Sequence, residues 1–398
     1  MGKTVDAAKA SKPTKAPDFS SGKPLEGIRV LDLSHLLPGP FCTMVLADLG
    51  AEVIKIENPK GGDGFRTRKP LLREEGTAFL MLNRNKKSVV IDLKTQEGKE
   101  FFFKMAKSAD VVLEQFRPGT VEKLGIDYKS LYPLNPELIY CSLSGYGQTG
   151  QYSQMPGHDI NYLSLSGVLD AIGAEGQAPV VPSIQIADIG GGAQWAIIAI
   201  LTALFGRSVT GQGQYIDVSM THCMLPWLSL FLSQYAVDGT VPERGATKGS
   251  GHFACYRIYE TSDAKFVSLG AAEPKFWARF CEIIERTDLI EDQYAEGDRR
   301  LELIKTLEQI FKSQTREYWS GLLLEAEVCF TPVLNFGEAV NSEFWASSGL
   351  VGSYSHPTEG EVLNIGHPLK FSGFATDAIT PAPILGADTA HYLQDVDK

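Results

Sequence analysis

The sequence is poor in cysteine and carries fewer basic than acidic residues. Its six cysteines stand singly among 398 residues, without any C-x-x-C pair. Neither a disulfide framework nor a cysteine zinc site is expected, which favours a reducing compartment, and we take this to be the cytoplasm. Lysine and arginine total 37 against 48 aspartate and glutamate residues, so that the formal net charge is −11. This charge argues against nucleic acid or an anionic membrane as a partner, but it leaves room for a local basic pocket that takes one anionic cofactor.

Long hydrophobic runs are also missing. A membrane span needs about 20 consecutive apolar residues, whereas apolar runs such as 195–205 have the length of a buried helix. Residues 1–23 mix lysine, aspartate, serine and proline and lack the apolar centre of a secretory signal. We expect a disordered leader there, with a transit peptide as the alternative. The whole chain is 43% hydrophobic and 21% charged, which is typical of a globular protein; we expect an enzyme.

A strand, a turn, a helix and a second strand follow one another early in the chain. The apolar run 28–33 ends at Ser34 and His35, Pro38-Gly39-Pro40 breaks the pattern, 41–49 has helical spacing, and 52–56 is again strand-like. This order is the unit of a parallel, doubly wound sheet. Further strands are expected at 88–93, 111–114, 138–142 and 215–218, and helices at 98–109, at 157–172 and from 190 past 205. Residues 24–235 are therefore predicted to form a large, Rossmann-like α/β domain.

The composition changes to glycine, threonine, lysine and proline at 236–252, which indicates a crossover to a second domain. We expect a smaller α+β domain over 236–344, with a hairpin from 256 to 269 and helices over 274–325. Residues 345–398 are rich in proline, glycine and serine. This C-terminal segment is predicted to run over the surface and to return to the large domain.

Several familiar catalytic motifs are absent. The chain has no G-x-x-x-x-G-K-[ST] phosphate loop, no H-E-x-x-H pair and no G-x-S-x-G elbow. The first strand-to-helix turn contains Pro38-Gly39-Pro40 rather than G-x-G-x-x-G, so a nicotinamide fingerprint is missing. The expected sheet therefore does not name a function by itself.

Three short segments carry candidate chemistry, each with an ordinary structural explanation beside it. His158 and Asp159 open an apolar helix, where they are either functional or a surface histidine and a helix-end carboxylate. Asp188 precedes Gly190-Gly191-Gly192, although glycine costs about 1 kcal/mol per helical position. Such a segment indicates either tight helix packing or N–H groups that hold a carbonyl oxygen as it becomes anionic. Glu273 before Pro274 is either a functional carboxylate or an ordinary helix start.

Taken together, these segments resemble one known family. The matching stretches are 24–33, 38–40, 49–57, 83–88, 117–119, 144–150 and 381–386. The chain resembles the class III CoA-transferase family, of the formyl-CoA transferase type, and within it the α-methylacyl-CoA racemases. The resemblance implies an acyl-CoA thioester as substrate, no cofactor beyond the CoA that the substrate carries, no metal, and two copies of the chain interlocked in a homodimer.

The resemblance also implies where CoA lies along the edge of the large domain. The candidate contacts come from the ends of successive strands: His35, Leu36, Leu37, Pro38, Leu93, Lys94, Gln115, Phe116, Lys123 and Leu124. Lys94 and Lys123 would offer positive charge to the phosphates. Many relatives carry an arginine after the second strand, where this chain has Asn58.

The catalytic residues implied by the resemblance are His158, Asp188 and Glu273. In racemases the histidine and the aspartate form an acid–base pair across the substrate α-carbon, and the glutamate, from the second domain, orients the histidine. In transferases the aspartate is instead a nucleophile that forms an anhydride and then an aspartyl-CoA thioester. The segment Gly157 to Tyr162 resembles the racemases. We therefore expect a racemase or epimerase of 2-methylacyl-CoA esters; the alternatives are a CoA-transferase acting through Asp188 and a CoA-binding subunit without activity.

The resemblance leaves two segments without a fixed role. Lys248 to His252 lies where transferases carry a flexible glycine loop over the active site, and it is either a lid or a link between domains. Ala387-Asp388 stands where the family more usually has Glu-His.

Overall fold

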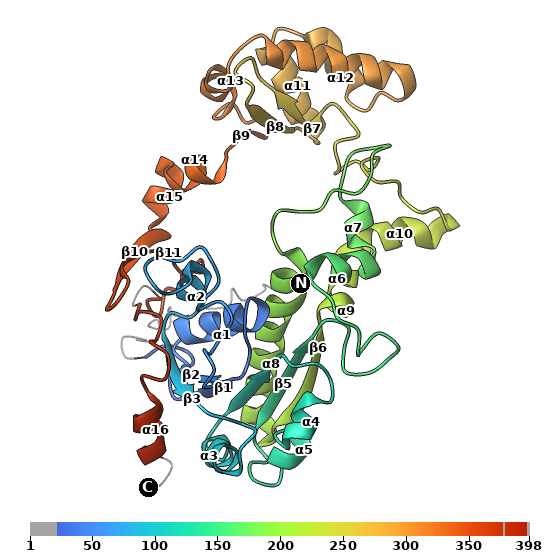
Figure 1. Ribbon diagram of the computed structural model, residues 1–398. Helices are drawn as coiled ribbons and strands as arrows, with labels where there is room; N and C mark the ends of the chain where they lie inside the picture. The colour runs from blue at the N-terminus through green and yellow to red at the C-terminus, as the bar shows by residue number, and fades with distance from the viewer. Residues whose placement is uncertain (1–21, 377–378, 396–398) are drawn as a thin grey trace, which may run out of the picture.

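A six-stranded parallel sheet forms the centre of the computed structural model, which describes residues 22–376 and 379–395 (Figure 1). Its strand order is β3-β2-β1-β4-β5-β6. The strands are β1 (Arg29–Asp32), β2 (Glu52–Glu57), β3 (Lys86–Val90), β4 (Val111–Glu114), β5 (Ile139–Ser144) and β6 (Gln214–Ser219). The predicted α/β, doubly wound fold is confirmed. The order reverses between β1 and β4, and in such sheets the crevice beyond the carboxyl ends of the strands at that point is where ligands bind.

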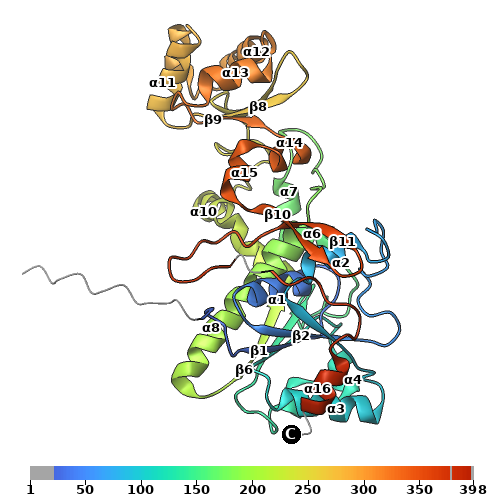
Figure 2. The same ribbon diagram turned by 90° about the vertical axis from the view of Figure 1, so that its left-hand side faces the viewer.

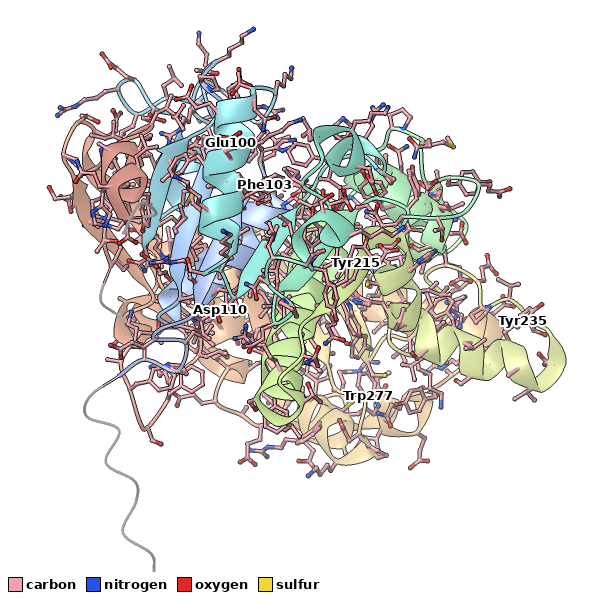
Figure 3. The ribbon with its side chains drawn as sticks, turned by 90° about the horizontal axis from the view of Figure 1, so that it is seen from below. Glu100, Phe103, Asp110, Tyr215, Tyr235 and Trp277 are labelled. Carbon is pink, nitrogen blue, oxygen red and sulfur yellow. The ribbon has the colours of Figure 1, made fainter. Side chains whose placement is uncertain are left out.

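Helices cover both faces of this sheet, because successive strand residues point to opposite sides. Val30 packs on the side of α1 (Pro38–Asp48) and α8 (Gln194–Thr210), whereas Leu31 packs on the side of α3 (Gln96–Ala106). Figure 3 shows α3, with Glu100 and Phe103 labelled, lying across the sheet when the molecule is seen from below. The shorter helices α2 (Thr77–Leu82), α4 (Thr120–Leu124) and α5 (Tyr128–Leu131) connect the strands. Burial on both faces explains why the strands appear in the sequence as apolar runs.

Two helix boundaries differ from the prediction. Pro38-Gly39-Pro40 does not separate the turn from the helix but forms the first turn of α1; proline is suited to this position, because the first N–H groups of a helix have no partner inside it. The predicted helix 157–172 is two helices, α6 (Asp159–Ser166) and α7 (Val168–Ala171). Gly167 between them has a φ of +82°, a left-handed conformation that ends α6.

A π-helical segment, η1 (Ala187–Ala193), precedes α8 and contains the three consecutive glycines. A Cβ at Gly190 would lie 2.6 Å from the ring of Trp227, and one at Gly191 would lie 2.7 Å from the carbonyl oxygen of Met220. All three glycines are buried and pack against α1 and α9 (Met220–Met224). Tight packing, rather than a ligand at the backbone, accounts for these glycines.

The helical stretch 187–210 is, by length and composition alone, apolar enough to cross a membrane. No unbroken apolar run marks this stretch in the sequence, because Asp188 and Gln194 interrupt it. In the fold this stretch packs against α1, β5 and β6 and so covers one face of the sheet.

A second core lies in residues 253–330, apart from the large sheet (Figures 1 and 2). The strands β7 (Tyr256–Glu260), β8 (Phe266–Gly270) and β9 (Phe330–Val333) form an antiparallel sheet covered by α11 (Pro274–Ile283), η3 (Thr287–Asp292), α12 (Gly297–Lys312) and α13 (Arg316–Leu323). The buried rings of Trp277, Phe280 and Phe311 form its centre. The chain reaches it through η2 (Leu225–Leu228) and α10 (Ser229–Asp238).

The C-terminal residues return to the large sheet through α14 (Phe336–Val340), α15 (Glu343–Ser348), the hairpin of β10 (Val351–His356) and β11 (Gly360–Ile365), and α16 (Thr389–Asp395). Asp388 fixes this return, because its carboxylate accepts the N–H of Ser88 on β3 at 2.9 Å. The hairpin was not predicted from the composition of the segment. Of the predicted disordered leader, 1–23, all but the last two residues lie outside the described chain.

Candidate active site

Two cavities open at the carboxyl ends of the strands around the point where the strand order reverses. The larger has a volume of about 910 Å³ and is lined by the turns after β1, β4 and β5 and by the start of α6. The smaller, of about 310 Å³, lies beyond β1, β2 and β3. His35 and Phe116 line both cavities, with their ring centroids 6.3 Å apart. The two spaces therefore adjoin at this pair of rings, which suits one long ligand with two chemically different ends.

Nine of the ten residues predicted to contact CoA line one or both cavities. The smaller cavity takes His35, Leu93, Lys94, Phe116 and Leu124, and the larger takes His35, Leu36, Leu37, Pro38, Gln115 and Phe116. Lys123 is exposed and lines neither. The Oε1 atom of Gln115 accepts the N–H of Gly39 at 3.0 Å, so its side chain is tied to the start of α1. Asn58 lines the smaller cavity, with its amide donating to the carbonyl oxygen of Gly62 at 3.0 Å.

His158 and Asp188 both line the larger cavity, although 29 residues separate them in the chain. His158 immediately precedes α6, and its N–H donates to Oδ1 of Asn161 at 3.0 Å. The N–H of Asp188 donates to Oδ1 of Asp159 at 2.9 Å. This bond ties η1 to the first turn of α6, so the backbone that carries one predicted catalytic residue is held by the neighbour of the other.

Asp188 has an unusual proton affinity for a carboxyl group. Its pKa is raised to about 6; burial is the largest cause, the nearby carboxylate of Asp159 adds to the rise, and His158 acts in the opposite direction. Near neutral pH a small fraction of Asp188 is therefore protonated, and the group exchanges protons readily. The influence of His158 on this pKa also requires that the two side chains lie within electrostatic reach of each other.

Tyr162 also lines the larger cavity and holds the segment that precedes His158. Its hydroxyl donates to the carbonyl oxygen of Gly157 at 2.7 Å, and its ring packs edge-on against Tyr146. Burial, together with the charge of Asp188, holds the pKa of Tyr162 well above its ordinary value. The tyrosine thus stays protonated and fixes the segment that leads into His158.

Glu273 is not brought to this site within one chain. It is exposed at the start of α11 in the second core and lines neither of the two cavities. Within residues 22–376 and 379–395 no hydrogen bond joins it to His158. The glycine-containing segment 248–252 also lines neither cavity; Nδ1 of His252 instead lies within hydrogen-bond distance, 3.0 Å, of the carboxylate oxygen Oε2 of Glu175.

Other groups at the site were not singled out from the sequence. Arg68 and Arg117 line the larger cavity and have no ion pair in the described part of the chain. The buried side chains of Lys55 and Asp63 lie beneath the turn after β1. A signal for this pair was available: a lysine between apolar neighbours in a strand buried on both faces requires a buried partner. Across the described ranges, no three histidine, cysteine or acidic residues cluster as metal ligands.

Comparison with known proteins identifies the family. The chain is 34% identical over 385 residues to human "Succinyl-CoA:glutarate CoA-transferase", covering 95% of this chain and 87% of that protein. It is also 34% identical over 372 residues to human "Alpha-methylacyl-CoA racemase", covering 93% of each. A crystal structure of a CAIB/BAIF family protein from Brucella suis superposes with a TM-score of 0.81 at 29% identity, covering 95% of this chain and 100% of that one. Residues 25–389 match the model of CoA-transferase family III, and the chain belongs to this enzyme family, which includes both CoA-transferases and racemases among its members.

Proposed function

We propose that this enzyme racemises or epimerises 2-methyl-branched acyl-CoA thioesters by 1,1-proton transfer between His158 and Asp188. The observation that carries the proposal is that these two residues line one cavity, together with the pKa of Asp188, which is raised to about 6 chiefly by burial. The α-hydrogen of a thioester is only weakly acidic, so its removal needs a positioned base with a proton affinity near the working pH. An imidazole and such a carboxyl group can exchange the roles of acid and base.

The proposed reaction conserves one proton on the pair. One group takes the α-proton while the C–H electrons move into the enolate, and the other group then donates its own proton to the opposite face of the α-carbon. The enolate oxygen needs hydrogen-bond donors. Asp159 and Ile160, at the start of α6, line the cavity, and their N–H groups lie at the positive end of the helix dipole. They are better candidates than Gly190 to Gly192, which are buried against other helices.

The two adjoining cavities suit the two ends of the substrate. We place the nucleotide part of CoA in the smaller cavity, where Lys94 offers positive charge, and the acyl thioester in the larger one. The passage between them, beside His35 and Phe116, would hold the pantetheine chain. Lys123 would contribute only as an exposed charge near this path.

The completed site would need a second copy of the chain. Glu273 would orient His158 only if it came from the partner of a homodimer, because α11, which Glu273 precedes, lies apart from α6, which His158 precedes (Figure 1). Large apolar side chains are exposed on α8 and α10: Phe205 is 75% exposed, Leu230 82% and Val237 84%. Tyr235, also on α10, extends away from the large sheet in Figure 3. Such faces are covered in most proteins, which favours the interlocked dimer.

The alternative function is CoA transfer through Asp188. A carboxyl group with a pKa of about 6 is mostly ionised at pH 7.5, as a nucleophile must be. A transferase named for succinyl-CoA and glutarate is as similar in sequence as the racemase. In this alternative reaction, His158 does not have to transfer a proton.

One assay separates the two reactions. The purified protein is incubated with a single enantiomer of a 2-methylacyl-CoA in heavy water, and both configuration and deuterium at the α-carbon are followed. We expect inversion with deuterium uptake, loss of both in His158→Ala, and retention of both in His222→Ala, a matched exposed histidine that lines neither cavity. Transfer of CoA to an added acid without α-exchange, with hydroxylamine-sensitive labelling of Asp188, would establish the alternative.

A further inference from the structure

Two buried ion pairs lie beneath the turn that follows β1. The Nζ atom of Lys55 on β2 lies 2.9 Å from Asp63, and that of Lys86 on β3 lies 3.3 Å from Asp32. All four side chains are at most 1% exposed. A buried ion pair adds little net stability, because the loss of hydration offsets most of the attraction between the charges. Net stabilisation therefore does not account for these pairs, and the contacts they make point to another role.

The Lys55–Asp63 pair holds the backbone of this turn at two points. Both carboxylate oxygens of Asp63 accept the N–H of Leu36 at 3.2 Å, and Nζ of Lys55 donates to the carbonyl oxygen of Ser34 at 2.8 Å. Leu36 has a φ of +64°, a left-handed conformation that leucine rarely adopts. Such a conformation persists only where its surroundings impose it, and the Asp63 carboxylate is the group that does so here.

The turn held in this way is a wall of both cavities. His35 lines both of them, and Leu36, Leu37 and Pro38 line the larger. The ring of His35 faces Phe116 at the passage between the two spaces. A change in the backbone at Leu36 would move His35 and would alter the width of that passage.

We propose that Lys55 and Asp63 are positioning residues for the CoA ester: their ion pair fixes the left-handed turn at Leu36 and so keeps the two cavities joined as one binding site. This inference rests on the proposed function, in which one CoA thioester occupies both spaces. Both residues line the smaller cavity, but their side chains are at most 1% exposed, so they act on the ester through the turn. Burial opposes ionisation of each, but their mutual attraction prevails, so the pKa of Asp63 lies below its ordinary value and that of Lys55 above. The pair is therefore charged at neutral pH.

The test measures the binding of free CoA by calorimetry to the full-length protein and to three variants: Asp63→Asn, Lys55→Met and the double variant. Asp63→Asn keeps an oxygen opposite the N–H of Leu36 but removes the charge that Lys55 holds. Lys55→Met leaves a buried carboxylate unpaired and can fail to fold. The double variant removes both charges, so no unpaired charge remains, and it decides the matter if either single variant does not fold.

The matched control is Arg84→Met. Arg84 forms a buried ion pair with Asp48 at 2.6 Å, with side chains 4% and 2% exposed, and neither residue lines the two cavities. We expect a loss of CoA affinity of about tenfold or more in the three variants, the size of effect that a displaced binding wall produces. The control should lose thermal stability but bind CoA as the unchanged protein does. In turnover, the variants should raise KM with little change in kcat.

Unchanged CoA affinity in the folded double variant would overturn the inference, because the turn would then hold its shape without the pair. An equal loss of affinity in Arg84→Met would overturn it as well, since the effect would be one of general destabilisation. Failure of the unchanged protein to bind CoA would instead refute the proposed function.

Discussion

Replacing Asp159 by asparagine should change the pH dependence of the reaction in a direction that the structure fixes. Asparagine keeps an oxygen that accepts the N–H of Asp188, now held at 2.9 Å, but removes the negative charge beside it. The pKa of Asp188 rises from 3.8 to about 6, with burial as the largest cause and Asp159 as the second. The charge of Asp159 is therefore the smaller of the two contributions that raise this pKa, and we expect its removal to lower the pKa by about one pH unit, or ~1.4 kcal/mol.

The direction in which the pH profile should move follows from the number of protons that His158 and Asp188 hold in the proposed reaction. The proposed racemisation needs one proton on the pair, so we expect its rate to fall at low pH as a second proton binds the pair. A lower pKa of Asp188 delays this double protonation. We expect the acidic limb of kcat/KM to move to lower pH by up to about one unit, and by the same amount for both enantiomers.

The assay is deuterium uptake at the α-carbon, measured from pH 5 to 9 with each enantiomer. Asp170→Asn is the control, because Asp170 is 68% exposed, pairs with Arg244 and lines neither cavity. An acidic limb that stays in place, or that moves to higher pH, would refute the argument that Asp159 raises the proton affinity of Asp188.

Three further predictions concern stability and assembly. Burial, the largest cause, raises the pKa of Glu114 to about 7, and a hydrogen bond from Ser142 opposes the shift. The stability that this group contributes is therefore present below pH 4.5 and is lost as pH rises through 7. Glu114→Gln should raise the free energy of unfolding at pH 8 by up to about 3 kcal/mol, measured as a higher melting temperature, but should not raise it at pH 4.5. Gly190→Ala should destabilise the fold by about 1–3 kcal/mol because its Cβ would meet Trp227, whereas Gly206→Ala, in open space within α8, should stabilise it by about 0.5–1 kcal/mol in denaturant titrations; equal effects would contradict the packing argument. Leu230 is 82% exposed, and Leu230→Glu should convert the proposed dimer into a monomer in sedimentation experiments. An unchanged protein that already sediments as a monomer would refute the proposed assembly.

The sheet could be predicted from the sequence because burial on both faces leaves a simple pattern. β1, β4 and β5 are short apolar runs with glycine, proline or polar residues at their ends. The hairpin of β10 and β11 gives no such pattern, since only alternate residues such as Tyr354 and Val362 are buried. The start of α1 was misjudged for a different reason: proline ends a helix from within but suits its first turn.

The site could be predicted only in part. Neither spacing nor composition indicates that His158 and Asp188 line one cavity. Their positions depend on η1 and on the hydrogen bond that the N–H of Asp188 donates to the carboxylate of Asp159. The resemblance to a family supplied that pairing. The same resemblance named ten CoA contacts, of which Lys123 alone lines neither cavity.

Within one chain, Glu273 does not reach the cavity that His158 and Asp188 line. Its side chain is exposed, and the hydrophobic centre beneath it, around Trp277 and Phe280, is complete without any contribution from the large sheet. His158 is likewise exposed at an open wall. The proposed acid–base pair works best where water is excluded. The exposed apolar faces of α8 and α10 and the exposed side chain of His158 are therefore what we expect if a second copy of the chain covers both in the proposed dimer.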